Sequence, residues 1–266
     1  MAQLTRTVRG ASAPHDQPSP ELEPGASGVI EAKVMSLADH LTELRRRIII
    51  AVVATGAGTV VGFWLSPDLL RVLTAPVPGP VYFSQPGGAL FLQIKLAVLI
   101  GLVVASPIIL YQLWAFVAPG LTARERRVAL PWLPLAVLCL LLGIGLAYAL
   151  LPMAVTFLLG FQIEGVIEPL IRADDYFGFV LMLFGGFGLA FQFPIVLILL
   201  SKLGIVTVDR LRRARRYVLL AIFIVAAVLT PPDPISQIIM GSAMYGLFEL
   251  SILLIGRSKP VAPTDD

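Results

Sequence analysis

Long apolar stretches alternate with short polar segments along most of the chain. Six stretches can be delimited, at residues 48–65, 91–118, 130–159, 177–201, 217–230 and 235–255. A helix of about 20 residues crosses the roughly 30 Å hydrocarbon core of a bilayer, and the first four stretches reach or approach that length. The pattern therefore predicts an all-α, polytopic membrane protein with six transmembrane helices.

The fifth and sixth predicted helices are short. Only Pro231-Pro232-Asp233-Pro234 separates them, and residues 217–230 would form about 21 Å of helix. Four long helices beside two short ones cannot close into an even cylinder, so we expect a concave, cupped bundle. Gln192 would face a groove in this bundle, next to a kink imposed by Pro194.

The composition agrees with a membrane protein and changes which functions are plausible. The chain is 57% hydrophobic and 14% charged, whereas soluble proteins average about 45–50% and about 25%. No His, Asp or Lys lies deep in an apolar stretch, and the single Cys139 lies within an apolar run. We predict no catalytic residue, no metal site and no cofactor, and the net charge of +3 does not indicate nucleic-acid binding.

The basic residues predict the orientation in the membrane. All but three of the 20 Lys and Arg residues lie in residues 1–47, 119–129, 202–216 and the C-terminal tail. Because cytoplasmic loops carry the excess of positive charge, both termini are predicted in the cytoplasm of a multi-pass protein of the cell membrane. Residues 1–34 are predicted as a disordered extension, residues 35–257 as the membrane domain and residues 258–266 as a short cytoplasmic tail.

Two glutamates on the predicted cytoplasmic side lie among arginines. Glu43 belongs to a helical pattern that continues into the first apolar stretch, and Glu125 follows Thr122 at the start of another predicted helix. Each has a structural interpretation: Glu43 would pair with Arg47 four residues later, and Glu125 would complete a capping box with Thr122. The functional interpretation is a pair of carboxylates that bind a ligand with guanidinium groups in bidentate fashion.

Several strings of the chain resemble the TatC family, the multi-spanning receptor subunit of the twin-arginine protein translocase. They are HLTELRRR at 40–47, TAPV at 74–77, SPIILYQLWAFVAPGL at 106–121, ERR at 125–127, FGLAFQFP at 187–194 and LTPPDPISQ at 229–237. They follow the order of the family over residues 36–256. Several long strings in order make the resemblance far more specific than a single short motif.

The resemblance implies a function. Proteins of this family recognise the S/T-R-R-x-F-L-K signature of folded cargo and recruit the single-span subunits TatA and TatB, with export driven by the proton-motive force. Signal-peptide binding would fall to the matching residues Glu43, Glu125, His40, Leu44, Arg45, Arg47, Arg126 and Arg127. Insertion or partner contact would involve Pro76, Phe116, Gln192 and Asp233. Membrane lipids and further copies of the chain would complete the expected partners.

Gln192 departs from the family, which often has glutamate at this position. Glutamine keeps the hydrogen-bonding capacity but cannot take up or release a proton. A polar contact to a partner helix is therefore the favoured hypothesis for this position over proton uptake.

Two other functions compete with the translocase. A six-span secondary transporter for a small anionic solute would place convergent charges near the midplane and often carry an inverted repeat, and neither is found in the sequence. A scaffold without transport, in which each glutamate is a cap or a surface pair, leaves the joint occurrence of the strings unexplained.

Overall fold

The computed structural model describes residues 37–118, 132–162, 170–202, 204–230 and 232–257. The chain divides into two compact units, residues 1–40 and residues 41–266. The described part of the first unit is the first four residues of helix α1.

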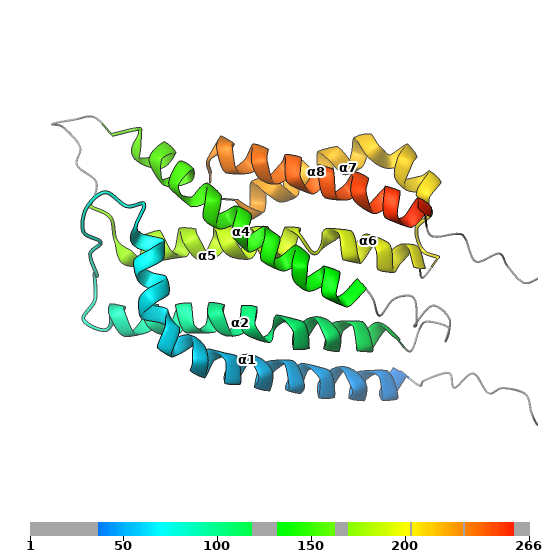
Figure 1. Cartoon of the computed structure of the whole chain (residues 1–266), viewed down its shortest axis with the longest axis horizontal. Helices are drawn as coiled ribbons and strands as arrows, with labels where there is room; N and C mark the ends of the chain where they lie inside the picture. Colours follow the sequence, from blue (N-terminus) through cyan, green and yellow to red (C-terminus); the bar gives the residue numbers. More distant parts are fainter. Residues whose placement is uncertain (1–36, 119–131, 163–169, 203, 231, 258–266) are drawn as a thin grey trace, which may run out of the picture. The chain divides into compact units, whose positions relative to one another are not determined.

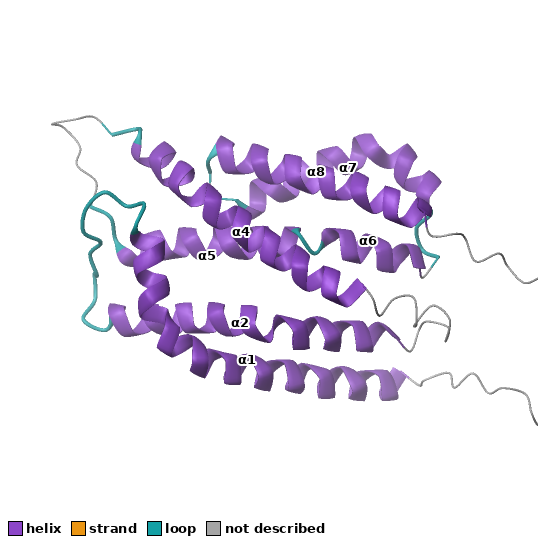
Figure 2. Ribbon diagram, in the orientation of Figure 1, coloured by secondary structure: helices purple, strands orange, loops and turns teal. Residues whose placement is uncertain are grey.

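The described residues are almost entirely helical (Figure 2). The helices are α1 Leu37–Thr74, α2 Gly88–Val117, α4 Trp132–Leu159, α5 Ala173–Ala190, α6 Phe193–Lys202, α7 Val208–Leu229 and α8 Pro234–Arg257. Within the described ranges the sole β-type pairing is an isolated bridge between Tyr82 and Arg172. The predicted all-α class is confirmed.

Five segments are long and apolar enough to cross a membrane: α1 from His40, α2, α4, α5 continued by α6, and α8. Helix α7 differs because its first half holds five arginines, at 210, 212, 213, 215 and 216. The helix begins at Val208, well before the predicted residue 217, and only its second half is apolar. The hydropathy pattern located this apolar half but not the whole helix.

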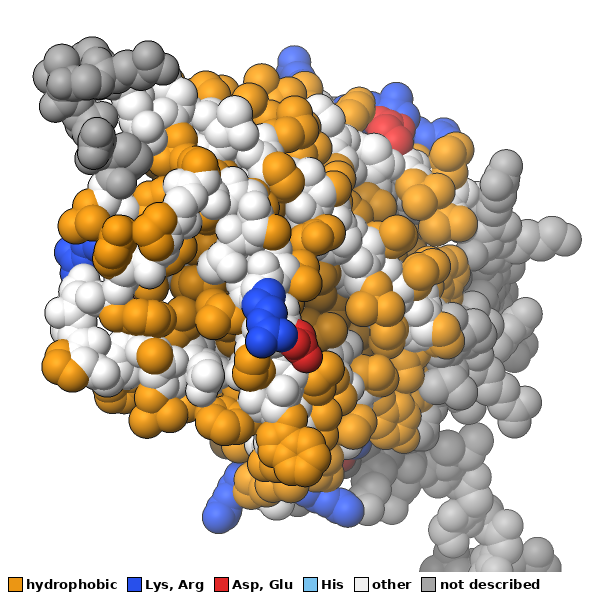
Figure 3. All heavy atoms as spheres, turned by 60° about the vertical axis from the view of Figure 1, so that its left-hand side comes forward, with side chains coloured by type: hydrophobic (Ala, Val, Ile, Leu, Met, Phe, Trp, Pro, Cys, Tyr) orange, Lys and Arg blue, Asp and Glu red, His pale blue; other side chains and the backbone are white. Residues whose placement is uncertain are grey.

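Much of the outer surface is apolar, as expected for a protein in lipid (Figure 3). Helix α1 contributes many exposed large side chains, among them Trp64 at 83% exposure. Within the apolar 18-residue window of each candidate span, the share of residues buried inside the protein is 11% for α1 and 56% for the α5–α6 segment. Because the bilayer itself covers apolar side chains, such a surface is compatible with a folded membrane protein.

Helix α5 forms the centre of the bundle. Its Phe177, Val180, Leu183 and Phe187 are essentially inaccessible, and its most extensive packing is against α4, with further contacts to α2, α7 and α8. The closeness of α4 depends on glycine, since a Cβ added at Gly143 would lie 2.6 Å from the carbonyl oxygen of Phe187. Small residues let helix backbones approach closely in membranes.

Helices α1 and α2 pack through a second set of small residues and lie side by side in Figure 1. A Cβ at Gly58 would lie 2.7 Å from the carbonyl oxygen of Gly101, and one at Gly62 would collide with the carbonyl oxygen of Ala97. Gly58 and Gly62 form a G-x-x-x-G pattern on α1 that faces Ala97 and Gly101 on α2. This close approach brings polar groups of the two helices within reach of one another.

The fourth predicted span is interrupted at Phe191 and Gln192, between α5 and α6. Pro194 has no N–H to donate, so it cannot continue the hydrogen-bond ladder of α5. The kink predicted at this point is therefore confirmed as a break between two helices.

Candidate functional site

The first polar region consists of Glu43 and Arg47 on α1 and Gln112 on α2, here called the guanidinium cluster. Helical spacing brings Glu43 and Arg47 to the same face of α1. The Arg47 Nη2 atom forms an ion pair with Glu43 Oε1, and Arg47 Nη1 donates a hydrogen bond of 3.0 Å to Gln112 Oε1. The side chain of Glu43 is 23% exposed and that of Arg47 is 19% exposed. The cluster is therefore partly shielded from solvent but accessible to a ligand.

The ion pair expected from the i,i+4 spacing is thus present, and Gln112 is an addition that sequence reasoning missed. Gln112 lies 65 residues from Arg47, within one of the family-like strings, and no local pattern links the two. Its polarity in an otherwise apolar stretch was the available signal.

Of the other residues predicted for signal-peptide binding, Leu44 and Arg45 lie in the described part of the second unit. Leu44 is partly buried and Arg45 is exposed. His40 is the last residue of the first unit, and its part in the site stays a prediction. Glu125, Arg126 and Arg127 lie outside the described residues, so the pairing of Glu43 with Glu125 also stays a prediction.

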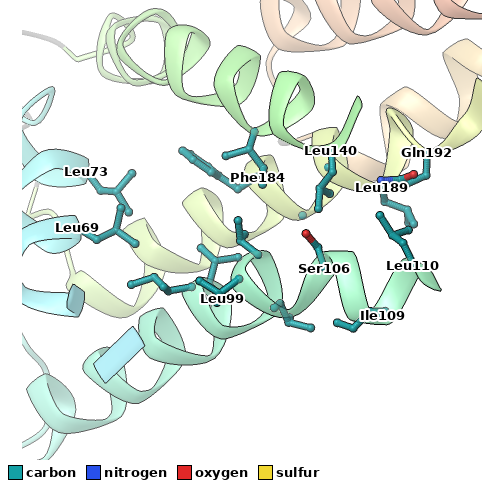
Figure 4. Close-up of a pocket in the computed structure, with 17 residues that line it drawn as sticks. Leu69, Leu73, Leu99, Ser106, Ile109, Leu110, Leu140, Phe184, Leu189 and Gln192 are labelled. Atoms are coloured by element: carbon teal, nitrogen blue, oxygen red, sulfur yellow. The ribbon is translucent and has the colours of Figure 1, made fainter. Parts of the chain in front are cut away.

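The second polar region is a groove of about 500 Å³ (Figure 4). Leucine, isoleucine, valine and phenylalanine side chains and two glycines line it, with Ser106 and Gln192 as the polar residues. Among the described residues, the buried Ser106 Oγ and Gln192 Oε1 have no hydrogen-bond partner. Gln192 Nε2 is satisfied, because it donates to the carbonyl oxygen of Ala136 at 3.1 Å.

Gln192 lines a groove, as predicted. The groove was expected to result from two short helices at the end of the chain, and its lining does not agree with that origin. Its lining residues come from α1, α2, α4, α5 and the α5–α6 break, and none of them belongs to α7 or α8, the helices that correspond to the predicted short pair. At Gly185, which lines the groove, a Cβ would meet nothing within 4 Å, so the space beside this residue is open. Helix lengths alone could not reveal this.

Asp233 caps the start of α8. Its Oδ1 accepts a 2.6 Å hydrogen bond from the backbone N–H of Ser236, and Pro234 occupies the first helical position, where no N–H is needed. Asp233 is 1% exposed, and its Oδ2 has no hydrogen-bond partner among the described residues. The role of Asp233 in complex integrity stays a prediction, but its structural part is clear.

Pro76 and Phe116 lie at the two ends of the α1–α2 pair. Pro76 follows α1 within a turn closed by a 3.0 Å hydrogen bond from the Val77 N–H to the Thr74 carbonyl oxygen. Phe116 is partly buried near the end of α2, one turn after Gln112. Neither position lines the groove, so their predicted part in insertion or partner contact is separate from that region.

Glu249 is the acidic residue of α8, and it has one partner on α7 and one on α8 itself. Arg215 Nη2 of α7 approaches Glu249 Oε2 at 2.7 Å, and the Tyr245 hydroxyl donates to Glu249 Oε1 at 3.1 Å. These contacts give Glu249 a structural part in holding α8 against α7.

Together these features define a polytopic helical membrane protein with a shielded carboxylate–guanidinium cluster and an apolar groove that contains two polar side chains. Residues 39–242 match the family model described as Sec-independent protein translocase protein (TatC). The chain belongs to the TatC family and is a component of the Sec-independent, twin-arginine protein translocase.

Relatives and solved structures agree with this family. The chain is 37% identical over 236 residues to the TatC protein of Carboxydothermus hydrogenoformans, covering 87% of this chain and 97% of the relative. It is 40% identical to a chloroplast protein of Pisum sativum, covering 87% of this chain and 65% of that relative. A crystal structure of the twin-arginine translocase receptor TatC matches with a TM-score of 0.70 and 36% identity, covering 81% of this chain and 98% of the other. The predicted translocase function is confirmed, and none of these matches is a solute transporter.

Proposed function

We propose that this chain binds twin-arginine signal peptides through Glu43 and Glu125, with His40, Leu44, Arg45, Arg47, Arg126 and Arg127 around them. The observation that supports it most directly is that Glu43 binds a guanidinium group in this fold, that of Arg47. The carboxylate is 23% exposed, so a peptide at the membrane surface can reach it.

The chemistry of the pair favours arginine over lysine in the signal. A guanidinium presents a planar fork that matches both oxygens of a carboxylate, whereas an ammonium is a compact point donor. A charge-assisted hydrogen bond contributes about 1.5–3 kcal/mol net, and two such carboxylates would discriminate strongly against a lysine pair.

The groove is the proposed contact for a transmembrane partner, for which the candidates are the single-span TatA and TatB subunits. A passing helix with a polar side chain would satisfy Ser106 Oγ and Gln192 Oε1, which have no partner among the described residues. Since glutamine does not titrate, the proposed role of Gln192 is a hydrogen bond and not proton uptake. Pro76, Phe116 and Asp233 would maintain the insertion path and the integrity of the complex.

The topology completes the proposal. Helix α7 would be the fifth of six membrane spans, with its arginines at the cytoplasmic surface among lipid headgroups and both termini in the cytoplasm. The bundle would be concave, and several copies would assemble with the partner subunits in a complex that exports folded proteins at the expense of the proton-motive force.

Site-specific crosslinking of a twin-arginine signal peptide to membranes that contain this protein tests the receptor function. Wild type, Glu43→Ala, Glu125→Ala and a twin-lysine peptide are compared. Crosslinks that form with the arginine peptide and fade in the two variants and with the lysine peptide support the proposal. Crosslinks indifferent to lysine and to both substitutions would return Glu43 and Glu125 to purely structural roles.

A further inference from the structure

Arg47 is held more tightly than a surface arginine would be. Its two terminal nitrogens are engaged by different helices, Nη2 by Glu43 on α1 and Nη1 by Gln112 on α2. Its Nε is buried and has no hydrogen-bond partner among the described residues. The side chains of an exposed i,i+4 ion pair usually keep much of their rotational freedom. Here a second contact, from a neighbouring helix, fixes the guanidinium group of Arg47.

Arg47 also occupies the group to which a signal arginine would bind. Glu43 Oε1 accepts from Arg47, and no further partner of Glu43 is found among the described residues. The strongest carboxylate–guanidinium geometry is bidentate and uses both oxygens. Because Arg47 already donates to Oε1, an incoming guanidinium in this geometry would lie against a second positive charge unless Arg47 moves away.

We propose that Arg47 is a resident guanidinium that occupies Glu43 in the resting state, that Gln112 holds it there, and that a signal arginine binds by displacing it. The inference rests on the proposed signal-peptide function and gives Arg47 a different part in it. Arg47 competes with the ligand instead of contributing to its affinity.

The displacement sharpens selection between arginine and lysine. Any ligand at Glu43 has to break the Arg47 ion pair and to disturb the bond from Arg47 to Gln112. An arginine replaces the lost contact with two parallel hydrogen bonds, whereas a lysine offers an ammonium without the matching fork. Both peptides lose the same free energy in displacing Arg47, but the arginine peptide recovers more of it at Glu43. The presence of Arg47 therefore disfavours binding of the lysine peptide, and this adds to the selectivity for arginine.

The test measures peptide binding to the full chain reconstituted in lipid nanodiscs. The probes are a fluorescent peptide with the S-R-R-x-F-L-K signature and the same peptide with two lysines. The variants are Arg47→Gln, which removes the competitor, and Gln112→Met, which keeps the side-chain volume but removes the acceptor that holds Arg47. Arg46→Gln is the matched control, because Arg46 is the exposed neighbour and its loss changes the net charge equally.

For Arg47→Gln we expect the Kd of the arginine peptide to fall about tenfold and that of the lysine peptide to fall further. The ratio of the two Kd values, which measures selectivity, would decrease. Gln112→Met is expected to act in the same direction with a smaller change. Arg46→Gln would change both Kd values by a similar small factor, through long-range charge alone.

Several outcomes overturn the inference. If wild type binds the arginine peptide and Arg47→Gln binds it equally or more weakly, Arg47 is a ligand contact or a bystander, and the receptor function itself stands. If Arg46→Gln matches Arg47→Gln, net charge explains the effect. If neither wild type nor Arg47→Gln binds either peptide, the receptor proposal fails together with the inference. Should Arg47→Gln not fold, Arg47→Lys, which keeps the charge but loses the fork, replaces it with the same expected direction.

Discussion

The guanidinium cluster and the groove both contain polar groups, but they differ in their acceptor oxygens: Glu43 Oε1 and Gln112 Oε1 of the cluster have partners, whereas two oxygens of the groove do not. In the cluster, Arg47 bridges Glu43 and Gln112 across two helices. In the groove, Ser106 Oγ and Gln192 Oε1 are buried without a hydrogen-bond partner among the described residues. Leaving a buried polar group without a partner is unfavourable, so the groove carries a cost that the cluster avoids at its carboxylate.

This difference determines what each region gains from a ligand. At the cluster a ligand exchanges one guanidinium contact for another, so the net gain is small and depends on geometry. At the groove a ligand supplies hydrogen bonds that were absent and covers apolar surface, so the gain is larger and less selective. We therefore expect the cluster to contribute mainly to the selectivity of ligand binding, and the groove mainly to its affinity.

Separating α1 from α2 should damage both regions and have the largest effect. In Gly58→Leu the new side chain begins 2.7 Å from the backbone oxygen of Gly101, and overpacking of this kind costs about 1–3 kcal/mol, occasionally more. We expect a clear loss of thermal stability in detergent and of peptide binding. Gly56→Leu on the same helix is the matched control, because a Cβ there meets nothing within 4 Å. Equal damage from both substitutions would show that the close approach is unimportant.

Removal of the Glu43 carboxylate should have the second-largest effect. Glu43→Ala deletes the acceptor and leaves Arg47 without its ion pair, and we expect binding of the twin-arginine peptide to weaken about 10- to 100-fold. Fluorescence titration of the peptide measures the change. Unaltered binding in Glu43→Ala would remove this residue from the site, whatever the behaviour of Glu125.

The groove should respond to polarity and not to charge. Gln192→Leu removes the hydrogen bond to Ala136 and the free oxygen, and we expect transport and partner association to fall by an amount equivalent to about 1–3 kcal/mol. Gln192→Glu keeps an acceptor and should remain active. Transport of a reporter cargo and copurification of the partner subunit provide the measurements. An active Gln192→Leu variant would contradict a polar contact.

The helix cap of α8 should have a smaller effect. In Asp233→Ala the N–H of Ser236 loses its acceptor, and the loss of such a cap costs about 1 kcal/mol. We expect a modest decrease in thermal stability in detergent. Asp233→Asn, which keeps a capping oxygen, should recover most of it, and a stability equal to that of Asp233→Ala would mean that the charge matters more than the cap.

Some of this molecule could be predicted from the sequence, and the reason lies in the range of the interactions. The apolar stretches at 91–118 and 130–159 correspond closely to α2 and α4, because lipid requires long runs of apolar side chains. The Glu43–Arg47 pair and the break before Pro194 are local and were predicted as well. The pair and the break depend on residues no more than about one helical turn apart, and the apolar stretches depend only on continuous sequence.

Contacts between distant segments escaped prediction. Hydropathy cannot detect the first half of α7, because arginines fill it although it is helical. The bond from Arg47 to Gln112 depends on how α1 packs against α2 through Gly58 and Gly62. The groove likewise lies among residues of α1, α2, α4 and α5, and none of its lining residues comes from α7 or α8. The bond and the groove are decided by tertiary packing, which a linear pattern does not contain.

Ser106→Ala should give the smallest change and the sharpest test of the comparison. The Ser106 hydroxyl is buried without a partner among the described residues, so its removal should leave the isolated chain equally stable or stabilise it by about 0.5 kcal/mol. Association with a partner that supplies the missing hydrogen bond should weaken by a few fold. Thermal denaturation of the isolated chain and copurification of the partner subunit measure the two effects. Gln112→Met is the counterpart at the cluster, where loss of a satisfied bond should lower stability. If Ser106→Ala instead destabilises the isolated chain, the hydroxyl is already satisfied within it, and the groove would then resemble the cluster.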